Sequence, residues 1–140
     1  MAVEIRGERQ GPWYVGPHHV EFRDLDAFGH VNNATYFSYF EWARALLWFE
    51  LTGTNTARDI GFIVAHASCD FRRQIDLEPI DICVRISEMG NSSIVFLHEI
   101  RKSSGSELAA TGKVVVVRFD WTTQSKMVIT EELRRKVAEW

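Results

Sequence analysis

Two aspartates and a histidine precede a long apolar segment, and together they suit the hydrolysis of an acyl bond. Asp24 and Asp26 follow a short segment of alternating apolar and charged residues, and His30 comes next, within a small turn that contains a glycine. If a helix begins at Asn32 or Asn33, its first N–H groups lack partners and carry a partial positive charge. Such a helix end stabilises an oxyanion, while a nearby carboxylate attacks the carbonyl carbon or deprotonates a water that does. The pattern therefore predicts an acyl-transfer site at this turn.

The same residues have structural interpretations that the sequence leaves open. Aspartate is common before helices as a turn or capping residue, so Asp24 and Asp26 fit either role. His30 could act as a base or as a structural hydrogen-bond donor. The adjacent His18 and His19 point to opposite faces of a strand and make a poor metal pair. No metal site is expected, and the sequence has none of the HExxH, P-loop or GxSxG motifs.

The apolar segment after the turn predicts a buried helix over roughly 33–51. The stretch 34–51 contains no Gly or Pro and few β-branched residues, and Gly53 is placed to end the helix. Apolar residues cover most of its circumference, which is typical of a buried helix. Because the segment contains Glu41, Arg44 and Glu50, we do not expect it to cross a membrane.

The rest of the chain predicts strands. A short extended piece is expected at 13–15 and a first strand at His18–Arg23, and later strands are expected at 62–71, 82–87, 93–102 and 108–121. Short turns between the later strands favour antiparallel hairpins. The continuous apolar run 114–117 predicts a central strand covered on both faces. Thr130 is placed to cap a short final helix.

Composition limits the classes of function. A chain of 140 residues is expected to form one domain, 1–140. The net charge is −3 with both signs interspersed, so we expect neither a nucleic-acid partner nor a polybasic membrane surface. Cys69 and Cys83 lack a CxxC spacing, and free buried thiols fit a reducing compartment. The N-terminus lacks the apolar core of a secretory signal, so a cytoplasmic location is expected.

These elements predict an α+β fold in which one long helix packs on an antiparallel sheet of about five strands. A single helix covers only one face of such a sheet. The apolar run 114–117 then needs cover from elsewhere, so we expect a homo-oligomer.

One stretch resembles a known family. The segment 24–36, DLDAFGHVNNATY, followed by Glu41-Trp-Ala-Arg44, resembles the 4-hydroxybenzoyl-CoA thioesterase-like branch of the hotdog-fold acyl-CoA thioesterases. Looser similarity at 68–71, 89–93 and 130–134 extends the resemblance over nearly the whole chain. It implies a hotdog fold, in which a curved sheet wraps one long central helix. It also implies a homodimer or homotetramer with the active site at the dimer interface.

The resemblance implies roles for individual residues. Asp26 corresponds to the family's catalytic carboxylate, described as nucleophile or general base, and Asn33 to the position whose backbone N–H holds the thioester oxygen. Short-chain bacterial relatives carry a histidine at that second position. The HVNN form here is instead similar to plant acyl-carrier-protein thioesterases, whose catalytic histidine corresponds to His30. The substrate-binding residues expected from the matching stretches are Tyr36, Glu41, Ser68 and Ser93.

The sequence hypothesis is therefore an acyl-CoA thioesterase that releases a free acid and CoA. Its acyl group would occupy an apolar tunnel along Tyr36, Phe37 and Phe40, whose aromatic lining suits an aryl or an aliphatic acid. No cofactor is expected, because coenzyme A is part of the substrate. Two alternatives stay open: a thioesterase directed at acyl-carrier protein, and a hotdog module that binds acyl-CoA without hydrolysing it.

Overall fold

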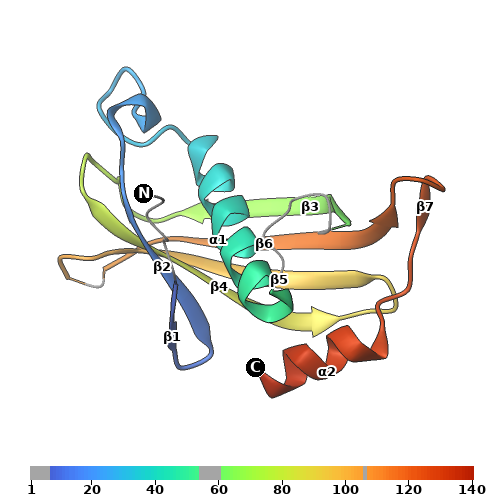
Figure 1. Ribbon diagram of the computed structural model, residues 1–140. Helices are drawn as coiled ribbons and strands as arrows, with labels where there is room; N and C mark the ends of the chain where they lie inside the picture. The colour runs from blue at the N-terminus through green and yellow to red at the C-terminus, as the bar shows by residue number, and fades with distance from the viewer. Residues whose placement is uncertain (1–6, 54–60, 106) are drawn as a thin grey trace, which may run out of the picture.

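A curved antiparallel sheet wraps one long helix in this protein (Figure 1). The computed structural model describes residues 7–53, 61–105 and 107–140. Within them the sheet has seven strands in the order β1-β2-β4-β5-β6-β3, with β7 paired to β6. The strands are β1 (Glu8–Gln10), β2 (Trp13–His19), β3 (Phe62–Phe71), β4 (Pro79–Met89), β5 (Ser93–Lys102), β6 (Glu107–Asp120) and β7 (Ser125–Lys126). The five long strands β2 to β6 match the sheet that the sequence predicts, and β1 and β7 are short additions.

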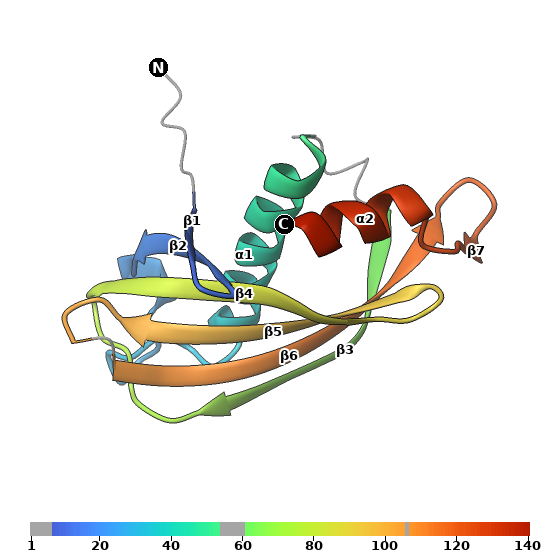
Figure 2. The same ribbon diagram turned by 90° about the horizontal axis from the view of Figure 1, so that it is seen from below.

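The long helix α1 (Thr35–Thr52) lies in the concave face of the sheet (Figure 2). Its buried residues pack on strand residues that point to the same side; they are Tyr36, Tyr39, Phe40, Ala43, Leu47, Trp48 and Leu51. Phe40 is 0% exposed and lies directly above Gly112 of β6, where an added Cβ would come within 2.4 Å of its ring. Glycine at 112 therefore lets the helix approach the sheet closely.

The two ends of α1 differ in how well the sequence predicts them. At the C-terminus Gly53 adopts φ 72°, and its N–H donates to the Phe49 carbonyl at 2.8 Å, which confirms the predicted stop. At the N-terminus the prediction of an asparagine N-cap is wrong, because Ala34 occupies the cap position without a side-chain cap. The Asn32 side chain accepts from the Ala34 N–H at 3.0 Å and so closes the turn just before the helix.

The first predicted strand, His18–Arg23, is also wrong in its bounds. The strand β2 ends at His19, and Phe22–Asp24 forms a short 3₁₀ helix. Glu21 and Asp24 close this turn on each other: the Glu21 N–H donates to Asp24 Oδ2 at 2.9 Å, and the Asp24 N–H donates to the Glu21 carbonyl at 2.9 Å. This local pairing competes with continuation of the strand.

One chain leaves apolar surface uncovered on both sides of the sheet. On α1, Phe37 is 38% exposed and Glu41 is exposed, so this helix is not buried all round as predicted. The strand β6 is central, between β5 and β3, as predicted. Its Val114 and Val116 are buried, but Val115 and Val117 face away from α1 and are only partly buried, so within one chain this strand is covered on one face.

The chain ends in α2 (Glu131–Glu139), on the same side of the sheet as α1 (Figure 2). Thr130 Oγ1 accepts from the Leu133 N–H at 3.2 Å, which confirms the predicted cap. Cys69 and Cys83 are free thiols, and burial is the largest cause that raises the pKa of Cys83, to about 12. Neither described helix has the length and apolar character needed to cross a membrane.

Candidate active site

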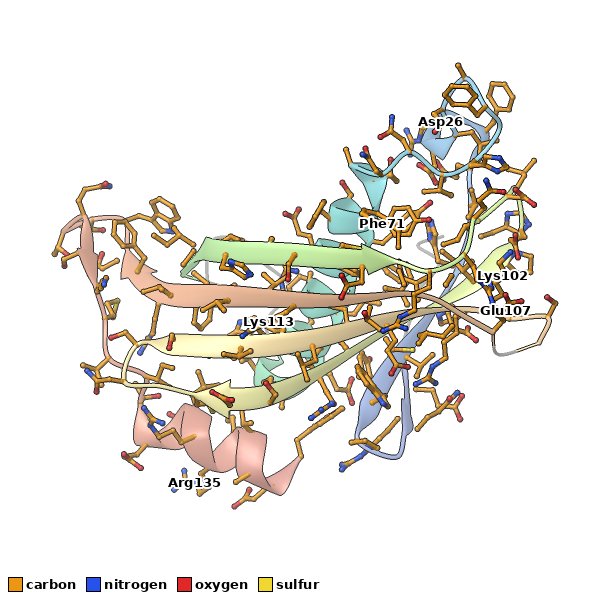
Figure 3. The ribbon with its side chains drawn as sticks, turned by 180° about the vertical axis from the view of Figure 1, so that it is seen from behind. Asp26, Phe71, Lys102, Glu107, Lys113 and Arg135 are labelled. Carbon is orange, nitrogen blue, oxygen red and sulfur yellow. The ribbon has the colours of Figure 1, made fainter. Side chains whose placement is uncertain are left out.

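The acidic loop between β2 and α1 is fixed to the connection between β3 and β4. The Val31 N–H donates to the Ile75 carbonyl at 2.8 Å, and the Asn32 N–H donates to the Asp24 carbonyl at 2.9 Å. Seen from behind, Asp26 lies on this loop beyond the start of α1, on the side of the molecule where β3 ends at Phe71 (Figure 3). The fold therefore places the loop, the helix start and the end of β3 at one corner.

The structure separates the roles of the two aspartates. Asp24 Oδ2 accepts hydrogen bonds from the Glu21 N–H at 2.9 Å and from the Tyr39 hydroxyl at 2.8 Å, so this carboxylate is engaged within the fold. Asp26 Oδ1 accepts from the Phe28 N–H at 2.9 Å and more distantly from the His30 N–H at 3.4 Å. Within the described residues no group donates to Asp26 Oδ2. The Asp26 carboxylate is therefore oriented by its loop and still has an oxygen available.

A cavity of about 440 Å³ lies against this carboxylate. Its lining consists of Asp26, His30, Val31, Asn32, Asn33, Tyr36, Phe71, Arg72, Arg73 and Gln74. Among the described residues no acceptor is found for the Asn33 N–H, whereas the next two N–H groups along the chain donate to Asn32. The residues that line the cavity thus include one with a partly open carboxylate and one at the helix start whose N–H has no acceptor among the described residues, and two such groups suit attack on a carbonyl and stabilisation of its oxyanion.

A third polar group enters the cavity from the same loop. His30 Nδ1 lies 2.9 Å from Asp76 Oδ1, and the side chain of His30 is 33% exposed. Sequence reasoning missed Asp76, because it lies 46 residues from His30 and no local motif marks it. The carboxylate of Asp76 orients the imidazole ring, as aspartates orient histidines in many hydrolytic sites.

Tyr36 brings a hydroxyl from the first turn of α1 into the cavity. Burial is the main cause that raises the pKa of Tyr36 to about 12, and the nearby Cys69 and Asp26 add to the rise. The phenol therefore stays protonated near neutral pH and remains a hydrogen-bond donor. Its ring packs edge-on against Phe71, with 4.8 Å between centroids.

Not all of the expected substrate-binding residues reach this cavity. Ser68 pairs with Lys113 on the sheet face opposite α1, where Figure 3 shows Lys113. Ser93 lies at the distant β4–β5 turn, where its carbonyl accepts from the Gly90 N–H. A substrate contact by either serine remains a prediction. Phe40, which the sequence predicts to line the acyl tunnel, is buried in the core, so the prediction that the tunnel runs along Phe40 is wrong.

A second pocket, of about 340 Å³, opens further along α1. Most of its lining is apolar; the lining residues are Glu41, Arg44, Ala45, Trp48, Phe49, Gly61, Phe62, Val64, Phe96, Val116 and Trp121. Arg44 is partly buried there, and its Nη1 lies 3.4 Å from His98 Nε2. His98 is 1% exposed, stacks on Phe40 with 4.5 Å between centroids, and has Nδ1 3.2 Å from the Cys83 carbonyl. These contacts fit a neutral His98 that donates from Nδ1 and accepts at Nε2.

The buried His98 should make the free energy of unfolding depend on pH. Burial first, and the Arg44 charge second, lower the pKa of His98 from 6.5 to about 3. Between these pH values only the unfolded chain binds this proton, so the free energy of unfolding falls as pH drops below about 6.5. The contribution of this single group approaches about 1.4 kcal/mol per pH unit. Urea unfolding from pH 7 to pH 4 measures the slope.

Two variants isolate the His98 contribution. His98→Leu should be less stable at pH 7 but should show a flatter decline toward acid. His66→Gln, at an exposed histidine on β3, should keep the wild-type slope. Equal slopes for His98→Leu and wild type would show that His98 is not the titrating group.

Comparison with known proteins gives one consistent family. The sequence model of the Thioesterase-like superfamily matches residues 20–137. A Bacillus subtilis protein, the uncharacterized YsmA, is 34% identical over 116 residues, which cover 76% of this chain and 78% of that protein. The long-chain acyl-CoA thioesterase FadM of Escherichia coli is 27% identical over 121 residues, which cover 82% of this chain and 89% of FadM.

A solved structure is similar over the same region. A thioesterase of Thermus thermophilus, crystallised with coenzyme A and Zn, is 31% identical and has a TM-score of 0.80. The similarity covers 89% of this chain and 91% of that one.

Proposed function

The chain belongs to the Thioesterase-like superfamily and is a hotdog-fold thioester hydrolase, and on this basis we propose that it cleaves acyl-CoA with Asp26 as the catalytic carboxylate. The observation that carries the proposal is the cavity lined by both Asp26 and Asn33, the latter with an N–H for which the described residues provide no acceptor. The complex of the Thermus thermophilus relative with coenzyme A supports CoA as the thiol part of the substrate.

In the proposed reaction the thioester carbonyl oxygen accepts a hydrogen bond from the Asn33 N–H at the positive end of α1. Asp26 then attacks the carbonyl carbon directly or removes a proton from the water that attacks. Negative charge that develops on the oxygen is stabilised by this N–H, and a single such donor contributes about 3 kcal/mol in other hydrolases. Collapse of the tetrahedral intermediate releases the CoA thiolate, which takes up a proton. When water is the nucleophile, this step leaves the free acid. When Asp26 attacks directly, it leaves an acyl anhydride on Asp26, and a water hydrolyses this anhydride to release the acid and restore the carboxylate.

His30 is assigned the role of moving a proton in this cavity, with Asp76 as its positioning residue. The Asp76 contact occupies Nδ1 and leaves Nε2 for the reacting groups. The exposed Arg72, also in the lining, is available to the phosphate groups of CoA, since arginine pairs well with phosphate. Arg73 instead pairs with Glu107 at 2.8 Å.

Asp76→Asn should lower kcat for acyl-CoA hydrolysis roughly tenfold or more, because the neutral amide orients and stabilises His30 less well. Steady-state assays of thiol release measure the loss. His30→Gln should cost more, and the double variant should be no slower than His30→Gln, since both changes act through one group. Glu107→Gln, a matched change of acid to amide outside the pair, should keep wild-type kcat. Additive losses in the double variant would contradict the pairing.

We also propose a homodimer or homotetramer in the cytoplasm. The partly buried Val115 and Val117, on the sheet face opposite α1, belong to a surface that a second copy would cover. Ser68 and Ser93 would contact substrate only in such an assembly.

A thiol-release assay over a panel of acyl-CoA and acyl-carrier-protein thioesters tests the proposed function. Turnover of CoA thioesters above carrier-linked ones supports it. Stoichiometric binding of acyl-CoA without thiol release would contradict it and favour a binding module.

A further inference from the structure

One face of α1 connects the two pockets. Asn33 in the first pocket is followed at steps of three or four residues by Phe37, Glu41, Arg44 and Trp48, so these positions share one side of the helix. Phe37, between the pockets, is 38% exposed. An acyl chain whose carbonyl lies at Asn33 can therefore follow this face into the second pocket.

The second pocket contains a cation, Arg44, that forms no ion pair within the described part of the chain. An arginine side chain has five N–H donors. Among the described residues, the guanidinium of Arg44 makes one hydrogen bond, from Nη1 to His98 Nε2 at 3.4 Å. No described carboxylate lies within ion-pair distance of this guanidinium. Burial is the main cause that lowers the pKa of Arg44 to about 10, so the group stays charged near neutral pH.

The surroundings of Arg44 suit a carboxylate from outside the chain. A partly buried charge is costly unless it is paired, and the planar guanidinium matches a carboxylate in a two-pronged geometry. The neutral His98 holds one edge of the guanidinium and contributes no compensating charge. Glu41, which lines the same pocket, is exposed and forms no ion pair among the described side chains, and the charge of its carboxylate raises the pKa of Arg44 only in part against the larger effect of burial.

Resting on the thioesterase function proposed above, we propose that Arg44 binds a carboxylate at the far end of the acyl chain, so that the substrates include the CoA monothioesters of long dicarboxylic acids. Arg44 lies eleven positions after Asn33, most of them in α1, and at the helical rise this separation corresponds to about 16 Å, or about 13 bonds of an extended chain at about 1.2 Å each. The Arg44 side chain leans toward the helix start, which shortens the path somewhat. A twelve-carbon diacid fits this span.

The test compares kcat/KM for dodecanedioyl-CoA and dodecanoyl-CoA, which differ only at the distal carbon. Wild type should favour the dicarboxylic substrate about tenfold or more, because a charge-assisted pair is gained only with that substrate. Arg44→Met should abolish the preference for the dicarboxylic substrate, and Arg44→Lys should retain part of it.

Glu41→Gln should increase this preference, because it removes a negative charge that would repel the distal carboxylate of the substrate. Arg135→Met, on the exposed side of α2 (Figure 3), is the matched control and should behave as wild type.

The outcomes separate this inference from the function on which it rests. If wild type hydrolyses both thioesters without preference, or if Arg44→Met keeps the preference, the inference is wrong and the thioesterase function stands. If Arg44→Met changes the oligomeric state while the preference persists, Arg44 serves a contact between copies and the inference is again wrong. If neither thioester is hydrolysed, the proposed function fails. In that case calorimetry can still test the inference by itself, by measuring the binding of free dodecanedioate and dodecanoate to wild type and to Arg44→Met. Tighter binding of dodecanedioate by wild type but not by Arg44→Met supports the inference, and equal binding contradicts it.

Discussion

Asp26→Asn should lower kcat for acyl-CoA hydrolysis about a thousandfold, within the range that general acid–base groups contribute. The amide keeps the shape of the side chain and can still accept from the Phe28 N–H, so the loop should remain in place. It can neither attack a carbonyl nor remove a proton from water. Single-turnover and steady-state assays of thiol release measure the effect, and thermal unfolding checks the fold.

Asp24→Asn is the matched control for this prediction. It makes the same change two residues away, in a carboxylate that accepts from Glu21 and Tyr39 inside the fold. Its kcat should stay within a few-fold of wild type, even if its stability falls. Equal losses in the two variants would show that the loop, and not the Asp26 carboxylate, sets the rate.

Phe40→Ala should reduce the free energy of unfolding by about 4 kcal/mol, the range found for removal of a buried phenylalanine. Phe40 is 0% exposed, stacks on His98 and lies above Gly112, so the cavity left behind would lie between α1 and the sheet. Urea unfolding at pH 7 measures the change. Phe37→Ala, on the exposed side of the same helix, should cost about 1 kcal/mol or less.

The close approach of Phe40 to Gly112 allows a second, independent test of how α1 packs on the sheet. Gly112→Ala alone should destabilise by about 1 to 3 kcal/mol, because its Cβ would come within 2.4 Å of the Phe40 ring. In a Phe40→Leu background the same substitution should cost much less. Additive losses would contradict the close approach of α1 to β6.

Local sequence predicts α1 and the long strands because their patterns are continuous. A run of helix-forming apolar residues ends at Gly53, and alternating β-formers are separated by short turns. Element ends are harder to predict because single side chains decide them. The reciprocal bonds of Glu21 and Asp24 end the extended segment early, and Asn32 closes a turn at a position where the sequence predicts the helix start.

The candidate site is only partly predictable, because much of it is made by long-range contacts. The motif around Asp26 and His30 is local and carries the family resemblance. The partner Asp76 comes from the β3–β4 connection, and only the folded chain distinguishes the engaged Asp24 from the partly open Asp26. His98 is an isolated strand residue in the sequence, and its contact with Arg44 spans 54 positions.

A crystal structure of Asp26→Asn bound to dodecanoyl-CoA tests the central claim most directly, since the slowed enzyme should hold an intact thioester. The account predicts that the thioester oxygen accepts a hydrogen bond from the Asn33 N–H while the side chain at position 26 faces the carbonyl carbon. A thioester bound with its carbonyl away from the start of α1, and with residue 26 turned from it, would contradict the account.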